Sequence, residues 1–227
     1  MSLQAAQAFL ARRDFASARQ AADAVLRDRP SDAQANQVAG LAALELGDVE
    51  VAKQHLRRAD AAAPGQPHIL NALGVACRRS GELAEARRLF TRAGERKLID
   101  GWRNLGNLES TAGAVLASSR AYERALKLKA DDAASHAGLA QALELLHKTD
   151  EAREHASKAL STDPANEIAA LTLANLAMRD GDAVEAENLA AAIVRRTRSP
   201  TNQALAWGIV GDARDRRGDA AEAFAAF

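Results

Sequence analysis

The chain has 227 residues, of which 48% are hydrophobic and only 4% aromatic, so its core must consist mainly of alanine and leucine. Its 30 basic residues balance 30 acidic ones, which argues against general nucleic-acid binding, because such binding normally needs a basic face and a net positive charge. No apolar run approaches the roughly 20 residues of a membrane span, and the first residues do not form a secretory leader. We therefore expect a cytoplasmic protein without a nucleic-acid or membrane partner.

A block of about 34 residues recurs along the chain, with small residues at fixed spacings. We expect repeats over residues 1–32, 33–66, 67–98, 99–132, 133–166 and 167–203, followed by a partial seventh over 204–227. The third repeat is among the most regular, and it reads Leu73-Gly74, Gly81, Ala86, Phe90 and Ala93. This period predicts helix pairs, because one pair cannot bury its apolar face without a stacked neighbour.

Each recurring residue type has a structural role in such helix pairs. Gly74 on the first helix and Ala86 on the second mark a close contact, where a larger side chain would overpack. Gly47 and its equivalents stand where the first helix must end in a left-handed conformation. Pro64 and its equivalents end the second helix. No segment shows the alternating pattern of strands, so the sequence predicts an all-α fold.

This register resembles the tetratricopeptide repeat (TPR) family, whose pattern combines Leu-Gly, Gly, Ala, an aromatic residue, Ala and Pro at these spacings. The resemblance covers nearly the whole chain and implies a single array, a right-handed α-solenoid of stacked antiparallel helix pairs. The chain departs from the pattern where Ala22, Ala156 and Ala190 replace the usual aromatic residue. Two length changes, near residues 95–98 and 196–201, are expected to lie in turns between repeats, which tolerate them better than helices.

Enzyme signatures are absent from the sequence: it contains no Gly-rich phosphate loop, no HExxH and no paired-cysteine motif. Glu151 and His155 share one face of a predicted helix, but a metal site needs three or four ligands. We interpret them as part of a solvated helix face. His136 stands where this pattern often has tryptophan, which predicts partial burial between helices. The sequence thus predicts no catalytic residue, no metal site and no cofactor.

The resemblance also implies a binding groove, because the first helices of TPR pairs line the concave surface of the solenoid. Asn71, Arg78, Arg103 and Asn107 form the most suggestive cluster of inward positions, since amides bind peptide backbone and arginines hold carboxylates. Asn175 and Arg179 occupy inward positions of the sixth repeat. The remaining inward positions include Gln34, Gln37, Leu41, His68, Val75, Arg79, Asp100, Ser110, Gln141, Glu144, Leu171 and Met178. A merely solvated inner face is the competing interpretation.

We expect the chain to be a protein-interaction scaffold that binds a peptide or protein segment in this groove. The cluster resembles the carboxylate-holding groove of chaperone-adaptor TPR domains, although their Lys/Asn pattern is not reproduced residue for residue. As an alternative, the chain is the non-catalytic accessory region of a larger enzyme. Residues 211–227 resemble the last repeat before the catalytic domain of bacterial TPR-sulfotransferase fusions, and that domain would then lie beyond Phe227.

Self-association through the last repeat is a third alternative, although a protein that continues past Phe227 explains the same feature more simply. Trp207, Phe224 and Phe227 would leave an apolar surface on the final helix pair, and exposed apolar patches commonly mark interfaces.

Overall fold

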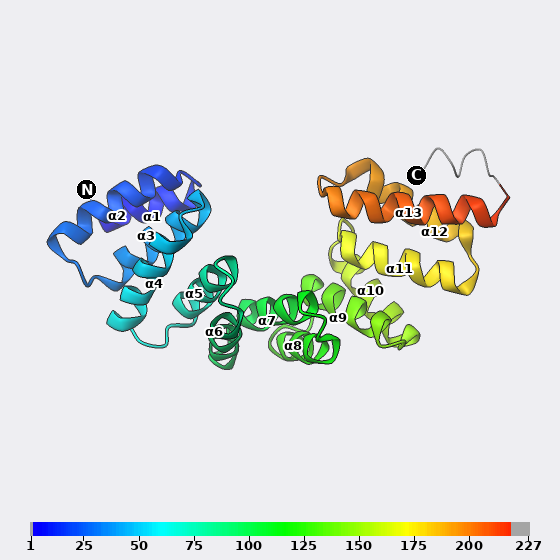
Figure 1. The fold of residues 1–227 in the computed structure, drawn as a ribbon, viewed down its shortest axis with the longest axis horizontal. Coiled ribbons are helices and arrows are strands. Elements are labelled where there is room, and N and C mark those ends of the chain that lie inside the picture. Colours follow the sequence, from blue (N-terminus) through cyan, green and yellow to red (C-terminus); the bar gives the residue numbers. More distant parts are fainter. Residues whose placement is uncertain (1, 219–227) are drawn as a thin grey trace. The chain divides into compact units, whose positions relative to one another are not determined.

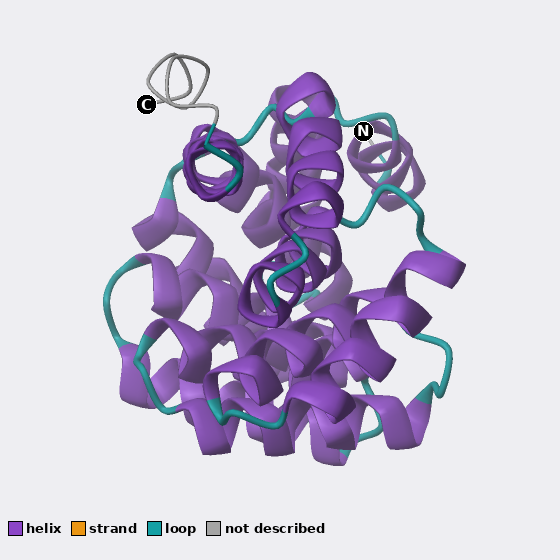
Figure 2. Cartoon of the chain, turned by 90° about the vertical axis from the view of Figure 1, so that its right-hand side faces the viewer, coloured by secondary structure: helices purple, strands orange, loops and turns teal. Residues whose placement is uncertain are grey.

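A computed structural model describes residues 2–218 of the chain, and within them it contains thirteen α-helices and no strand. Figures 1 and 2 show successive helices joined by short loops. In chain order the helices are α1 (Leu3–Ala11), α2 (Phe15–Asp28), α3 (Ala33–Leu46), α4 (Val49–Ala62), α5 (Pro67–Arg79), α6 (Leu83–Glu95), α7 (Ile99–Thr111), α8 (Val115–Leu128), α9 (Ala133–Leu145), α10 (Thr149–Thr162), α11 (Glu167–Asp180), α12 (Ala183–Arg196) and α13 (Pro200–Arg216). The predicted all-α fold of stacked antiparallel helix pairs is confirmed.

We call the first helix of each pair its A helix and the second its B helix. The A helices are α1, α3, α5, α7, α9, α11 and α13. The chain divides into two compact units, Met1–Leu108 and Glu109–Phe227. In the first unit α3 packs on α1 and α5, and in the second α11 packs on α9 and α13. Neighbouring A helices therefore form a continuous A-helix face within each unit. That all repeats form one array stays a prediction.

Helix ends follow from local side chains and glycines. Asp32 begins α3 by accepting a hydrogen bond from the backbone N of Ala35 at 2.9 Å, and Asn166 begins α11 in the same way. Such caps satisfy backbone donors that have no partner inside the helix. Gly47 ends α3 with φ at 87°, a left-handed conformation that glycine adopts without steric cost. The predicted role of the turn glycines is confirmed.

The close helix contacts also lie where the glycines predict them. A Cβ atom added at Gly74 would lie 2.6 Å from Cε1 of Phe90, and one added at Gly40 would lie 2.6 Å from Cγ of Leu56. Phe90 and Leu56 are both fully buried. The A and B helices of these two repeats therefore approach so closely that no side chain fits at either glycine.

The length change near 196–201 differs from the prediction. Residues Pro200 and Thr201 belong to α13, which has 17 residues where α11 has 14. Ser199 caps this helix by accepting from the backbone N of Asn202 at 3.3 Å. Pro200 fits the first helical position because its missing N–H would have had no partner there. The extra residues thus lengthen a helix, and their placement in a turn was wrong.

The shortening near 95–98 is shared between a helix and a turn. Helix α6 has 13 residues where α4 has 14, and the turn at 96–98 is shorter than the turn at 63–66. This length change therefore lies only partly in the predicted turn.

No helix within residues 2–218 is both long enough and apolar enough to cross a bilayer. The expected aromatic surface of the last repeat is only partly described: Trp207 is 37% exposed, while Phe224 and Phe227 lie outside the described residues.

Candidate functional site

In the first unit, the predicted residue Asn71 of α5 contacts α7. Nδ2 of Asn104 donates a hydrogen bond to Oδ1 of Asn71 at 2.9 Å, and both side chains are half-buried. The sequence analysis did not single out Asn104. Asn71 therefore helps to join two A helices.

The two arginines of the predicted cluster have different surroundings. Arg103 forms an ion pair with Asp100, three residues earlier on α7. Arg78 lies half-buried near the end of α5, and no ion pair holds it within residues 2–218. Asn107 is exposed on α7. One of the two predicted carboxylate-binding cations is thus already paired inside the chain.

Arginines near the ends of A helices reach back to the preceding A helix. Nη1 of Arg79 donates to the backbone O of Leu44 at 2.5 Å, and Nη1 of Arg216 donates to the backbone O of Met178 at 2.5 Å. Each of these carbonyls lies in the last turn of its own helix, where a nearby cation interacts favourably with the negative end of the helix dipole. We call these contacts arginine clasps.

The third arginine clasp involves a carboxylate. Nη2 of Arg179 lies 3.4 Å from Oε1 of Glu144, whose side chain is only 8% exposed. Burial raises the pKa of Glu144 above its usual value, while Arg179 and a hydrogen bond with Asn175 act in the opposite direction. Arg179, predicted as a groove residue, is therefore also a structural contact between α9 and α11.

A hollow of about 290 Å³ opens on the A-helix face of the second unit. Four predicted inward positions on α9 and α11 line it together: Gln141, Glu144, Leu171 and Asn175. Helix α13 completes the lining with residues that the sequence analysis missed, including Leu205, Gly208, Ile209 and Asp212. Leu205, Gly208 and Asp212 stand at inward positions of the partial seventh repeat, so the repeat register could have found them, but the sequence analysis named inward positions only up to the sixth repeat.

The first unit has a smaller hollow of about 260 Å³ between α3 and α5. The predicted inward residues Gln34, Gln37 and His68 line it. The structure does not bring Asn71, Arg78, Arg103 or Asn107 into this lining. The predicted positions of this unit are thus divided between the hollow and the neighbouring surface of α5 and α7.

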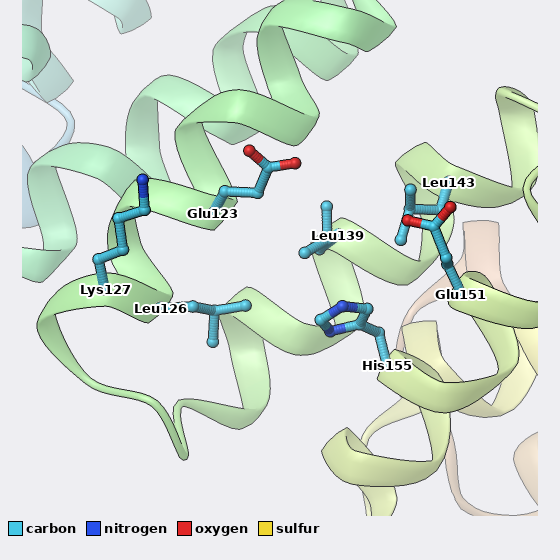
Figure 3. Close-up of a pocket in the computed structure, with 7 residues that line it drawn as sticks. All are labelled: Glu123, Leu126, Lys127, Leu139, Leu143, Glu151 and His155. Carbon is cyan, nitrogen blue, oxygen red and sulfur yellow. The ribbon is translucent and has the colours of Figure 1, made fainter.

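A third hollow, of about 370 Å³, lies between α8, α9 and α10 in the second unit. Figure 3 shows the side chain of Leu126 of α8 pointing toward the ring of His155 of α10, with Leu139 of α9 drawn above the ring. Glu123, Lys127, Leu143 and Glu151 complete the lining. No group of three or more His, Cys, Asp or Glu side chains within residues 2–218 is arranged to hold a metal ion.

The ring of His155 contacts the ring of a second histidine, His136. Nδ1 of His155 lies 2.8 Å from Nδ1 of His136, and Nε2 of His136 lies 2.9 Å from the backbone O of Ala130. His136 is 6% exposed, so it is more deeply buried than the sequence predicted. Its role is to anchor α10 on α9.

Stacked helix pairs with an open A-helix face define a class of repeat proteins that present extended binding surfaces. Models of the tetratricopeptide repeat match residues 3–67, 39–96 and 103–167, and a second such model matches residues 145–208. The chain belongs to the tetratricopeptide repeat family. No curated protein sequence matches it.

Solved structures share the fold at low sequence identity. The Pseudomonas aeruginosa protein pilF is 18% identical, with a TM-score of 0.78 over 88% of this chain and 92% of its own. PilW, a type IV pilus biogenesis factor, is 19% identical, with a TM-score of 0.74 over 88% of this chain and 94% of its own. YrrB, described as a TPR protein with an unusual peptide-binding site, is 15% identical, with a TM-score of 0.62 over 92% and 98%.

Proposed function

We propose that this chain is a protein-interaction scaffold that holds a peptide or protein segment on the A-helix face of its repeats. The hollow between α9, α11 and α13 carries this proposal, because inward positions predicted from the repeat register meet there around an open space. YrrB, which shares the fold, is described as having a peptide-binding site. In this proposal the chain acts by binding and performs no chemistry of its own.

The lining of this hollow suits an extended peptide. The side-chain amides of Gln141 and Asn175 each offer both a donor and an acceptor, which matches the alternating N–H and C=O groups of a peptide backbone. Leu171 and Ile209 offer nearly buried apolar surface beside them. Because all these residues lie on helices, little conformational entropy is lost when they bind.

The first unit would carry a binding surface of its own. Asn71, Arg78, Arg103 and Asn107 lie on its A helices. Arg78, which has no ion-pair partner within residues 2–218, would provide the charge that holds a carboxylate of the ligand. Asn175 and Arg179 would act in the second unit, the latter while keeping its contact with Glu144.

A display library of short random peptides, selected against the whole chain, tests this proposal. We expect selected peptides to bind about tenfold more weakly when Gln141→Ala and Asn175→Ala are combined, since two backbone-binding amides are lost. The matched control combines Gln54→Ala and Asn188→Ala, which remove exposed amides from the B helices α4 and α12. Failure to select any peptide, or equal losses in the two double variants, would contradict the proposal.

A further inference from the structure

Gly208 lies in the middle of α13, and no contact within residues 2–218 accounts for a glycine there. A Cβ atom added at Gly208 would meet no atom within 4 Å, whereas one added at Gly74 would lie 2.6 Å from Phe90. Gly208 also has no left-handed backbone conformation. Glycine inside a helix is less favourable than alanine because it leaves the backbone less restricted when unfolded. In the part of the chain that the structure describes, neither packing nor backbone geometry therefore explains this residue.

Gly208 lies at the place where we propose that a ligand binds. It lines the hollow between α9, α11 and α13, and the same inward position carries Asn71 in α5 and Leu171 in α11. Where α5 and α11 have a side chain at this position, α13 presents only backbone atoms. A glycine of this kind permits another backbone to approach closely.

We propose that this hollow binds an extended peptide bearing a lysine or arginine, with the peptide backbone lying against Gly208. This inference rests on the proposed function and adds the chemistry of the bound segment.

The charges of the lining favour a cation. Glu144 and Asp212 contribute carboxylates, the remaining lining residues are uncharged, and no basic residue is among them. Arg179, next to the hollow, offsets Glu144, which leaves the charge of Asp212 at the exposed rim on α13. A cationic side chain that reached Asp212 would therefore gain an ion pair without displacing one already made.

Apolar surface beside these carboxylates suits the stem of such a side chain. Leu171 and Ile209 are nearly buried at the base, and Leu205 is 55% exposed at the side. Lysine and arginine bury their methylene groups on apolar surface while their charged ends remain near polar groups. The combination of apolar base and acidic rim thus matches one basic side chain better than an acidic or a purely apolar one.

Two capped peptides that differ in one residue test the inference: Ala-Leu-Arg-Leu-Ala and Ala-Leu-Glu-Leu-Ala. Binding to the whole chain is measured by amide chemical shifts of α11 and α13 at low and high salt. We expect the arginine peptide to bind at least about tenfold more tightly at low salt, with a smaller difference at high salt because exposed charges are then screened.

Three variants test whether peptide binding depends on Asp212 and Gly208. Asp212→Asn should remove most of the preference for arginine, whereas Glu185→Gln, which neutralises an exposed carboxylate on the B helix α12, should leave it unchanged. Gly208→Leu should abolish binding of both peptides, because its side chain would occupy the space of the ligand backbone, while its Cβ atom would meet no atom within 4 Å. Circular dichroism confirms that each variant is folded.

Different outcomes separate this inference from the proposed function. Equal binding of the two peptides, or undiminished binding to Gly208→Leu, would overturn the inference and leave the scaffold function standing. If neither peptide binds, the sequences selected from the display library test the inference instead. Selected peptides that share a lysine or arginine support the inference, and selected peptides without one overturn it. If the library also yields no peptide, both proposals fail.

Discussion

His136 faces His155 through the same polar contact that joins Asn36 to His55 three repeats earlier. In the earlier repeat, Oδ1 of Asn36 lies 3.0 Å from Nδ1 of His55, while Nδ2 of Asn36 donates to the backbone O of Pro30 at 2.9 Å. In the later repeat, the two ring nitrogens of His136 take the places of these amide atoms. A histidine and an asparagine thus perform one structural role.

This equivalence fixes the proton positions in the histidine pair. The backbone O of Ala130 only accepts, so Nε2 of His136 must carry a hydrogen. Nδ1 of a neutral His136 then accepts, and Nδ1 of His155 donates to it, as Nδ1 of His55 donates to Asn36. The hydrogen bonds of the pair are thus complete when both rings are neutral.

Acidification should therefore destabilise the second unit. Burial lowers the pKa of His155, and the charges of His136 and Lys158 lower it further, whereas Glu154 and Glu151 raise it. A histidine with a lowered pKa binds fewer protons in the folded state, so its stabilising effect is complete above about pH 6.5 and is lost as the pH falls through its folded pKa. We expect a lower urea midpoint at about pH 5.5 than at about pH 7.5.

His136→Asn tests the role of the second imidazole. The variant should keep both hydrogen bonds, as Asn36 does, and remain within about 1 kcal/mol of the natural stability at neutral pH. Without the charge of His136, the pKa of His155 should rise and the loss of stability in acid should shrink. NMR titration of the His155 ring measures this change, and a lower His155 pKa in the variant would contradict the proton positions given above.

The contact between Arg179 and Glu144 should be worth more than an exposed ion pair, because the carboxylate is buried. Arg179→Ala would leave Glu144 without its cation and should reduce the free energy of unfolding by about 1–3 kcal/mol. Since burial already raises the pKa of Glu144, it should rise further in the variant. Protonation then relieves the penalty, so the loss should be largest above the raised pKa and smaller in acid.

A double-mutant cycle with Glu144→Gln separates the ion pair from other effects. Arg179→Ala should cost little when Glu144 is already neutral, and urea unfolding of all four proteins measures this difference. Additive losses in the double variant would show that the two side chains do not interact.

Much of this fold could be predicted from sequence because its determinants are local and repeated. Glycines that end a helix, such as Gly47, and glycines at a close helix contact, such as Gly74, recur at fixed positions in several repeats. Their roles can therefore be recognised from the sequence. The start of α13 was misplaced because Ser199 and Pro200 were interpreted as a turn. The same two residues are a helix start signal, and this interpretation could have been made.

The contacts between repeats were harder to predict, because they depend on how two helices lie beside each other. A signal for the arginine clasps does exist: Arg79, Arg179 and Arg216 each stand two residues before a turn glycine. The sequence analysis treated the first two as groove residues because a side chain at an inward position can face either the ligand or the next helix. Only the neighbouring carbonyl or carboxylate distinguishes these roles.

His147 stands in the turn between α9 and α10, where the repeat pattern usually has glycine. Its φ angle is 60°, a left-handed conformation that costs a residue with a Cβ atom about 1 kcal/mol or more. His147→Gly should relieve this strain, partly offset by the greater freedom of glycine in the unfolded chain. We expect a net gain of up to about 1 kcal/mol in thermal or urea unfolding. A loss of stability would show that the imidazole makes a compensating contact.

Alanine substitutions at two helical glycines should have opposite effects. At Gly74 the new methyl group would lie 2.6 Å from the fully buried Phe90 ring, and overpacking of this kind costs about 1–3 kcal/mol. At Gly208 the methyl group would meet nothing within 4 Å, so the higher helix propensity of alanine should stabilise α13 by about 0.5–1 kcal/mol. Thermal unfolding of the two variants compares them directly. If Gly208→Ala were destabilising, an unrecognised contact would explain that glycine and the argument for a ligand backbone at this position would lose its basis.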